Sequence, residues 1–166
     1  MTDTRTEMSE RLFRDVLGHY CTGVAVITAM DGDEPVGFSC QSFQSLSLRP
    51  PMVSFAPATT STTWPRIRRA GAFAANILTT EQDELGRGFA VSGADKFAGV
   101  SWRPGRVGAP LLEGALATVE CEIAGEVEAG DHVIVLGRVR HLKAGDGSPL
   151  LFYRGRFDTL ASATPA

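Results

Sequence analysis

The sequence has 166 residues, which is enough for one compact domain with an apolar core but cramped for two. Its net charge of -3 gives no electrostatic reason to expect nucleic acid or an anionic membrane as a partner. No stretch approaches the roughly 20 consecutive apolar residues that span a bilayer. The polar start MTDTRTEMSE lacks the apolar core of a secretory signal, so we expect a cytoplasmic protein.

Hydrophobic periodicity and turn residues predict short elements along the first half of the chain. A helix over 9–20 comes first, because apolar residues recur at helical spacing and Ser9 can cap its first turn. The predicted elements that follow are a strand over 24–30, a turn over 31–35, a hairpin partner from Val36 onward, a strand over 52–56, a helix over 61–70 with Trp64 and Ile67 facing inward, and a strand over 72–78.

In the second half of the chain, hydrophobic periodicity and turn residues predict mainly strands. Thr80 and Asp83 resemble a capping pair for a helix that ends near Phe89, and the segment 91–110 is irregular. The predicted strands are 116–127, 132–142 and a last short one over 150–157, and we expect flexible tails at 1–8 and 161–166 around one domain over 9–160. Without regular βαβ alternation, the order favours a mainly β fold, a closed or nearly closed antiparallel barrel with a few short helices.

Motifs for several chemistries are missing from the sequence. There is no G-x-S-x-G elbow, no phosphate-binding G-x-x-x-x-G-K-[ST] loop and no G-x-G-x-x-G after a strand. The three histidines have no metal-ligand spacing, so we expect no metal. The three cysteines are few and widely spaced, which fits buried reduced thiols better than disulfides. The residues concerned are His19, His132, His141, Cys21, Cys40 and Cys121.

Two stretches rich in hydroxyl side chains remain. One is VGFSCQSFQSLSLRPP over 36–51, in which Ser45 and Ser47 fit plain alternation along a strand. The other is TTSTT over 59–63, directly before the predicted helix. Hydroxyls and unpaired amides at a helix start can bind an anion. They can also form an ordinary cap and polar turn, and the local pattern alone favours this second interpretation.

Taken in order, several segments resemble the flavin reductase family, small NAD(P)H:flavin oxidoreductases with an FMN-binding split-barrel fold. No single segment is specific, but the ordered set over nearly the whole chain is. Ser39, Cys40 and Gln41 depart from the family pattern, where Thr, Ala and Asn or Ser are usual. The segments are FRDVLG (13–18), TGVAVIT (22–28), VGFSCQSF (36–43), SLSLRPP (45–51), NIL (76–78), DKFAG (95–99), GDH (130–132) and LFYRG (151–155).

The resemblance implies a fold, an activity and a partner. The fold is a six- to seven-stranded antiparallel split β-barrel with Greek-key order. The activity is hydride transfer from NADH, or NADPH with NADH favoured, to FMN or FAD. The reduced flavin then passes, by diffusion or transient contact, to a flavin-dependent monooxygenase that hydroxylates phenolic or steroid-derived aromatic compounds. A homodimer is implied as well, because barrels of the family pair through a face near the flavin site.

The resemblance also implies the residues of the site. The isoalloxazine ring needs hydrogen-bond partners without a fixed charge beside it, which the loop over 36–42 can supply, with Gly37 letting the backbone approach closely. Thr62 and Thr63 would take the phosphate, with Arg87 and Phe89 near it. The implied flavin-binding residues are Pro35, Val36, Gly37, Phe38, Ser39, Gln41, Ser42, Phe55, Ala56, Pro57, Thr62, Thr63, Arg87 and Phe89.

His132 is implied as the catalytic residue. In the family this position lies over the flavin, where a histidine can orient the nicotinamide and offset the charge of the reduced ring. Without the resemblance His132 would be an ordinary surface histidine in a turn. Asp95 to Phe97 are implied to order a loop over the site. The residues implied to face the nicotinamide nucleotide are Tyr153, Arg154, Gly155 and Arg156.

Two other functions remain open at the level of the sequence. An FMN-dependent oxidase of the same fold, acting on a substrate like pyridoxamine phosphate, would want several basic residues around a second phosphate, and no such set is evident. A non-catalytic FMN-binding module would bind flavin tightly with negligible NAD(P)H turnover. The sequence does not separate FMN from FAD.

Overall fold

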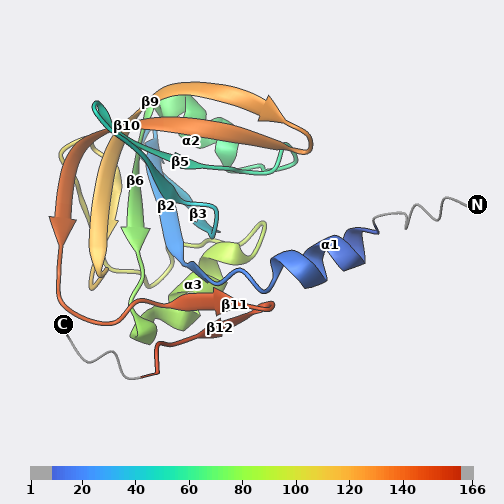
Figure 1. The fold of residues 1–166 in the computed structure, drawn as a ribbon. Coiled ribbons are helices and arrows are strands. Elements are labelled where there is room, and N and C mark those ends of the chain that lie inside the picture. Colours follow the sequence, from blue (N-terminus) through green and yellow to red (C-terminus); the bar gives the residue numbers. More distant parts are fainter. Residues whose placement is uncertain (1–8, 162–166) are drawn as a thin grey trace, which may run out of the picture.

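The computed structural model, which describes residues 9–161, is built on a seven-stranded antiparallel sheet that curls into a split barrel (Figure 1). The strands follow the spatial order β3-β2-β6-β9-β10-β5-β4. This confirms the predicted mainly β fold. The strands are β2 (Ala25–Asp31), β3 (Glu34–Cys40), β4 (Gln44–Leu48), β5 (Pro51–Phe55), β6 (Ala72–Ile77), β9 (Ala117–Ala129) and β10 (His132–Ala144).

Two smaller sheets complete the fold. One joins β1 (Thr22–Gly23), β11 (Leu151–Tyr153) and β12 (Arg156–Asp158), and the other is a hairpin of β7 (Trp102–Pro104) and β8 (Pro110–Leu112). The prediction of a single strand over 150–157 was therefore wrong. Arg154 and Gly155 both adopt positive φ, at 49° and 80°, and this left-handed turn reverses the chain between β11 and β12.

Four short helical segments lie outside the sheets, the first of them projecting away from the barrel (Figure 1), and none within residues 9–161 is both long and apolar enough to cross a membrane. Ser9 caps the first helix as predicted, accepting a hydrogen bond from Leu12 N at 3.1 Å. The second capping pair is Thr79 with Gln82, one residue before the predicted pair. The helices are α1 (Glu10–Leu17), α2 (Trp64–Ala70), the 3-10 turn η1 (Thr80–Gln82) and α3 (Asp83–Ala90).

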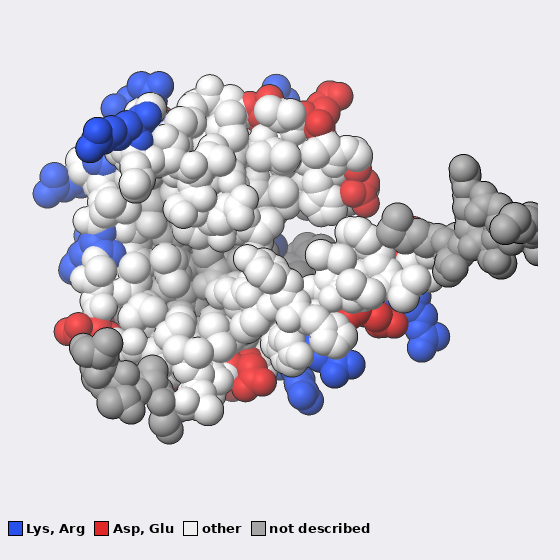
Figure 2. Space-filling model, in the orientation of Figure 1, with Lys and Arg blue, Asp and Glu red and all other residues white. Residues whose placement is uncertain are grey.

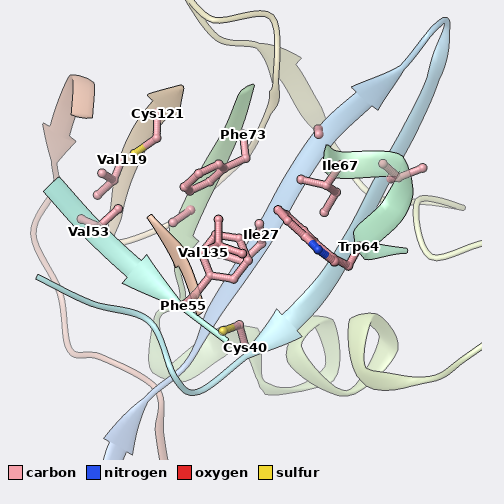
Figure 3. Packing of buried hydrophobic residues seen from close by; sticks show 13 residues of the cluster. Ile27, Cys40, Val53, Phe55, Trp64, Ile67, Phe73, Val119, Cys121 and Val135 are labelled. Atoms are coloured by element: carbon pink, nitrogen blue, oxygen red, sulfur yellow. The ribbon is translucent and has the colours of Figure 1, made fainter. Parts of the chain in front are cut away.

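The main core lies inside the barrel and is closed by α2 (Figure 3). Phe55 is at its centre, with ring centroids 5.0 Å from Phe73 and 5.7 Å from Trp64, both edge-on. Trp64 and Ile67 are buried, as predicted from the helix pattern. All three cysteines are free, but Cys21 is exposed rather than buried. A second apolar cluster under α3 includes Val24, Val26, Leu78, Phe89, Leu112 and Leu150.

Ion pairs fix α2 against the turn between β2 and β3. Arg66 Nε lies 2.6 Å from Asp31 and its Nη2 lies 2.6 Å from Glu34, while Arg69 reaches Asp31 at 2.8 Å. The hydrogen bonds from Arg66 and Arg69 lower the pKa of Asp31. The segment that leads into α2, with its run of hydroxyls, is therefore held next to β3.

Gly137 of β10 lies against the ring of Phe73. A Cβ at this position would stand 2.6 Å from Phe73 Cζ and 3.2 Å from Val53 Cγ2. Because Phe73 is fully buried against Phe55, it has little room to move. We expect Gly137→Ala to lower the free energy of unfolding by about 1–3 kcal/mol, measured by chemical denaturation.

A matched control is Gly125→Ala on β9, where the nearest atom to an added Cβ is Leu136 Cδ1 at 3.9 Å. This change should stay within about 0.5 kcal/mol of the wild type. Equal losses in the two variants would show that the contact with Phe73 does not matter.

Candidate functional site

A cavity of about 520 Å³ opens where the end of β3, the exit of β5, the entry to α2 and the start of β10 meet. Seven of its lining residues carry hydroxyl groups, and none is an acid. The lining comprises Phe38, Ser39, Cys40, Gln41, Ser42, Ala56, Pro57, Ala58, Thr60, Ser61, Thr62, Thr63, Phe89, Ala90, Ser92, Lys96 and His132.

Two other hollows have few hydroxyl groups in their walls. These hollows, of about 460 and 470 Å³, lie between the β7–β8 hairpin and strands β9 and β10, and they share no lining residue with the cavity beside His132. Thr118 is the one hydroxyl residue in each of these linings. The cavity beside His132 is therefore the stronger candidate for a ligand with many hydrogen-bonding atoms.

The connection between β3 and β4 forms one wall of the cavity. Ser42 ties this connection to the exit of β5, because its Oγ accepts a hydrogen bond from Ala56 N at 2.8 Å. Cys40 Sγ lies 3.3 Å from the same oxygen. Burial raises the pKa of the Cys40 thiol, so it stays protonated and neutral. The wall thus offers hydroxyl and amide groups without a fixed charge.

Gly37 precedes this wall and is needed for packing. A Cβ on Gly37 would lie 2.7 Å from Ile27 O and 3.1 Å from the Phe89 ring. Its missing side chain therefore faces the neighbouring strand and α3. The structure therefore gives Gly37 a packing role, in which it lets β3 approach β2 and Phe89, and its approach to a ligand stays a prediction.

His132 is held over the cavity by the β9–β10 turn. It forms a bridge with Ala58, and on either side Thr59 N donates to Asp131 O at 2.8 Å and Val133 N donates to Pro57 O at 3.0 Å. His132 Nδ1 lies 2.7 Å from Asp131 Oδ1, and this hydrogen bond lowers the pKa of Asp131. The pairing occupies Nδ1 and leaves Nε2 for another partner, with the side chain 46% exposed.

Lys96 was not among the predicted ligand residues, yet it lines the cavity. Its Nζ donates to Gly37 O at 3.2 Å, and the next residue, Phe97, stacks edge-on against Phe89 with centroids 5.0 Å apart. Partial burial lowers the pKa of Lys96. In the sequence, Lys96 belongs to the DKFAG segment over 95–99, which the family resemblance implies to order a loop over the site.

The structure distributes the predicted site residues over several places. Arg87 does not line the cavity beside His132. Its guanidinium pairs with Asp83 at 2.9 Å and lies 5.0 Å from the centroid of the Phe157 ring. The residues 153–156 lie in the β11–β12 hairpin, outside the cavity lining. The predicted residues inside the cavity are Phe38, Ser39, Gln41, Ser42, Ala56, Pro57, Thr62, Thr63, Phe89 and His132.

Two smaller hollows adjoin the cavity at different places. One, of about 410 Å³, contains the predicted Pro35, Val36 and Gly37, and it shares Thr62, Thr63 and Lys96 with the cavity. The other, of about 490 Å³, contains the predicted Phe55, and it shares Gln41, Ser42 and Ala56 with the cavity. The cavity and these two hollows therefore join into one groove, and its part beside Thr62 and Thr63 is also lined by Glu34, Arg66 and Asp95.

Comparison with known proteins agrees with this geometry. Residues 17–161 match the model of the flavin reductase like domain. The chain is 44% identical over 165 residues to the reductase subunit HsaB of a flavin-dependent monooxygenase from Mycobacterium tuberculosis, covering 96% of this chain and 88% of the relative. It is 39% identical over 149 residues to the FMN reductase (NADH) SmoA of Agrobacterium fabrum, covering 90% and 85%.

A solved structure shows the same fold. The NADH:FAD oxidoreductase SgcE6 of Streptomyces globisporus, in complex with NAD and FAD fragments, superposes with a TM-score of 0.88. The two sequences are 37% identical, and the match covers 92% of this chain and 93% of that one.

Proposed function

The chain belongs to the flavin reductase family, and we propose that the groove beside His132 is where it binds a flavin for reduction. The protein is an NADH-dependent flavin reductase that uses FMN or FAD. Bound flavin supplies the chemistry by accepting a hydride from the nicotinamide. The observation that carries the assignment of the site is the neutral hydroxyl wall beside a single histidine, within a cavity of about 520 Å³.

The residues present fit the polar edge of a flavin. Its ring presents several acceptors and one donor, and Ser39, Gln41 and Ser42 offer both kinds of group without a carboxylate to repel a reduced, anionic ring. We place the ring at the end of the groove lined by Gln41 and Ser42. The phosphate then lies toward Thr62 and Thr63, at the other end.

His132 orients the nicotinamide in this proposal. The hydrogen bond to Asp131 fixes the imidazole, and the bridge to Ala58 fixes the backbone beneath it. Its half-exposed side chain is then available to a second ligand that enters over the first. An imidazole there holds the nicotinamide at near-attack distance and offsets negative charge that develops on the ring. The hairpin over 153–156 remains our proposal for contacts to the rest of that nucleotide.

The reduced flavin is consumed by a monooxygenase. HsaB is the reductase subunit of such an enzyme, and this chain aligns with it over nearly its whole length. We propose that the partner of this chain hydroxylates a phenolic or steroid-derived aromatic compound, and that it receives the reduced flavin by diffusion or transient contact.

A homodimer is the second part of the proposal, and α1 is the surface that supports it. No residue of α1 is buried, although its apolar side chains follow helical spacing. Phe13, Val16 and Leu17 are each more than half exposed, at 52%, 57% and 51%. In Figure 2 the charged residues near α1 lie along its lower edge. A second copy of the chain would cover this apolar face.

The activity is tested with flavin-free protein, NADH or NADPH, and FMN or FAD in excess. We expect NADH oxidation whose rate rises with added free flavin, because the reduced product leaves the groove. Tight flavin binding with no turnover by either nucleotide would contradict the assignment. It would point instead to a non-catalytic FMN-binding module or to an oxidase of the same fold.

Replacing His132 tests its role in hydride transfer. We expect His132→Ala to lower kcat on the order of ten-fold, less than the loss for a fully buried electrostatic donor because the side chain is half exposed, and to raise KM for NADH. His141→Ala on the same strand is the matched control, since His141 lines a hollow that shares no residue with the groove. Equal rates in the two variants would remove His132 from the mechanism.

Charge on the apolar face of α1 tests the dimer. The wild type should sediment at about twice the 17.7 kDa chain mass. The double change Phe13→Asp, Val16→Asp should give a monomer, because carboxylates would have to be buried between the copies. Arg11→Asp, whose side chain is 93% exposed on the polar side of the helix, should leave the dimer intact. A wild-type monomer would contradict the proposal.

A further inference from the structure

We propose that Thr59 is a positioning residue for hydride transfer, because its hydroxyl holds the β9–β10 turn, and with it the imidazole of His132, over the flavin groove. The inference rests on the proposed function, since it assigns a task in the reduction of flavin. It adds a side chain that lies outside the cavity lining and that was not among the predicted site residues.

The tip of the β9–β10 hairpin needs support from elsewhere in the chain. β5 pairs with residues 135–138 of β10, and β6 pairs with residues 117–122 of β9. Residues 127–134 extend past these neighbouring strands and pair with each other. The segment that follows β5 runs along this tip (Figure 1). Because His132 lies at the start of β10, its position depends on what holds the tip in place.

Thr59 is turned toward this tip rather than into the cavity. Every residue from Ala56 to Thr63 lines the cavity except Thr59. Its Oγ1 donates a hydrogen bond to Asp131 O at 3.1 Å, and its N–H donates to the same oxygen at 2.8 Å. One side chain in this run of hydroxyls therefore holds the turn instead of lining the groove.

Asp131 passes this constraint on to the histidine. Its Oδ1 lies 2.7 Å from His132 Nδ1, but its side chain is 93% exposed. A carboxylate in water orients an imidazole well only when its own backbone is fixed, because solvent competes for the hydrogen bond. The two hydrogen bonds from Thr59 fix that backbone. Thr59 therefore acts on the imidazole through Asp131.

Thr59 is itself anchored to the core of the barrel. Ser61 N donates to Ala58 O at 3.0 Å, which closes the turn that contains Thr59. Ser61 Oγ accepts a hydrogen bond from Trp64 N at 3.1 Å at the start of α2, and Trp64 is buried. Fixed contacts thus lead from the core through Thr59 to the turn that carries His132.

Steady-state kinetics of Thr59→Val test the proposal, because this change removes the hydroxyl and keeps the shape of the side chain. We expect kcat/KM for NADH to fall about three- to ten-fold, the effect of one neutral hydrogen bond. The affinity of flavin-free protein for FMN, measured by quenching of flavin fluorescence, should change less than about two-fold, on the order of experimental error for a bond outside the cavity. Thr59→Ser keeps the hydroxyl and should retain most of the wild-type kcat/KM.

The matched control is Thr118→Val on β9. Thr118 lines hollows that share no residue with the cavity beside His132, so this change should leave kcat/KM for NADH at the wild-type value. An unchanged kcat/KM in Thr59→Val would overturn the proposal. An equal loss of FMN affinity in that variant would overturn it as well, because Thr59 would then act on the flavin.

The double variant Thr59→Val, His132→Ala separates positioning from a general structural role. Once the imidazole is gone, removing the hydroxyl of Thr59 should change kcat/KM less than about two-fold, because the two residues act in one network. A further fall as large as that of Thr59→Val alone would count against the proposal, since Thr59 would then act without the imidazole.

A failure of the proposed function would be seen in other samples. The wild type would not oxidise NADH in the presence of flavin, or His132→Ala alone would keep the wild-type rate. Either result would overturn the role of Thr59 along with the mechanism on which it rests. A loss in His132→Ala without a loss in Thr59→Val would leave the function in place and overturn the positioning role alone.

Discussion

The site depends on how the seven-stranded sheet closes on itself. Its two edge strands, β3 and β4, are consecutive in the chain and are joined by residues 41–43, so the barrel remains split at that point. The hydrogen bond from Ala56 N to Ser42 Oγ fixes this connection against the exit of β5. Backbone groups that a closed barrel would use for pairing are thereby left at the rim of a cavity, where a ligand can meet them.

Charge is kept to the ends and the opening of the groove. The wall around Ser39 and Ser42 is neutral, and burial keeps the Cys40 thiol protonated. Lys96 stands at one end, and His132 with its carboxylate partner stands over the opening. In the proposed function, a ring that becomes anionic on reduction is therefore surrounded by hydroxyl and amide dipoles, with no carboxylate in the cavity lining.

The sequence predicted the features that local physics dictates. The sequence pattern located most strands of the seven-stranded sheet, and Trp64, Ile67 and the Ser9 cap were placed correctly. The prediction of an irregular segment over 91–110 missed strand β7 and the start of β8. The reversal at Arg154 was missed because a non-glycine residue with positive φ leaves little signal in a sequence. The Arg87–Asp83 ion pair could be expected from the sequence, since Asp83 lies four residues before Arg87 on the same helix. The position of Lys96 in the cavity could be found only from the tertiary structure, because Lys96 and its hydrogen-bond partner Gly37 on β3 are far apart in the chain.

The same features account for a flavin that enters and leaves. The cavity beside His132 is lined by one lysine and several neutral hydroxyls, with a half-exposed histidine at its opening. Product release then requires no large rearrangement of the barrel. A rigid barrel whose groove binds flavin with moderate affinity suits an enzyme whose product must reach a second protein. Tighter binding of the reduced flavin would slow its transfer to the monooxygenase.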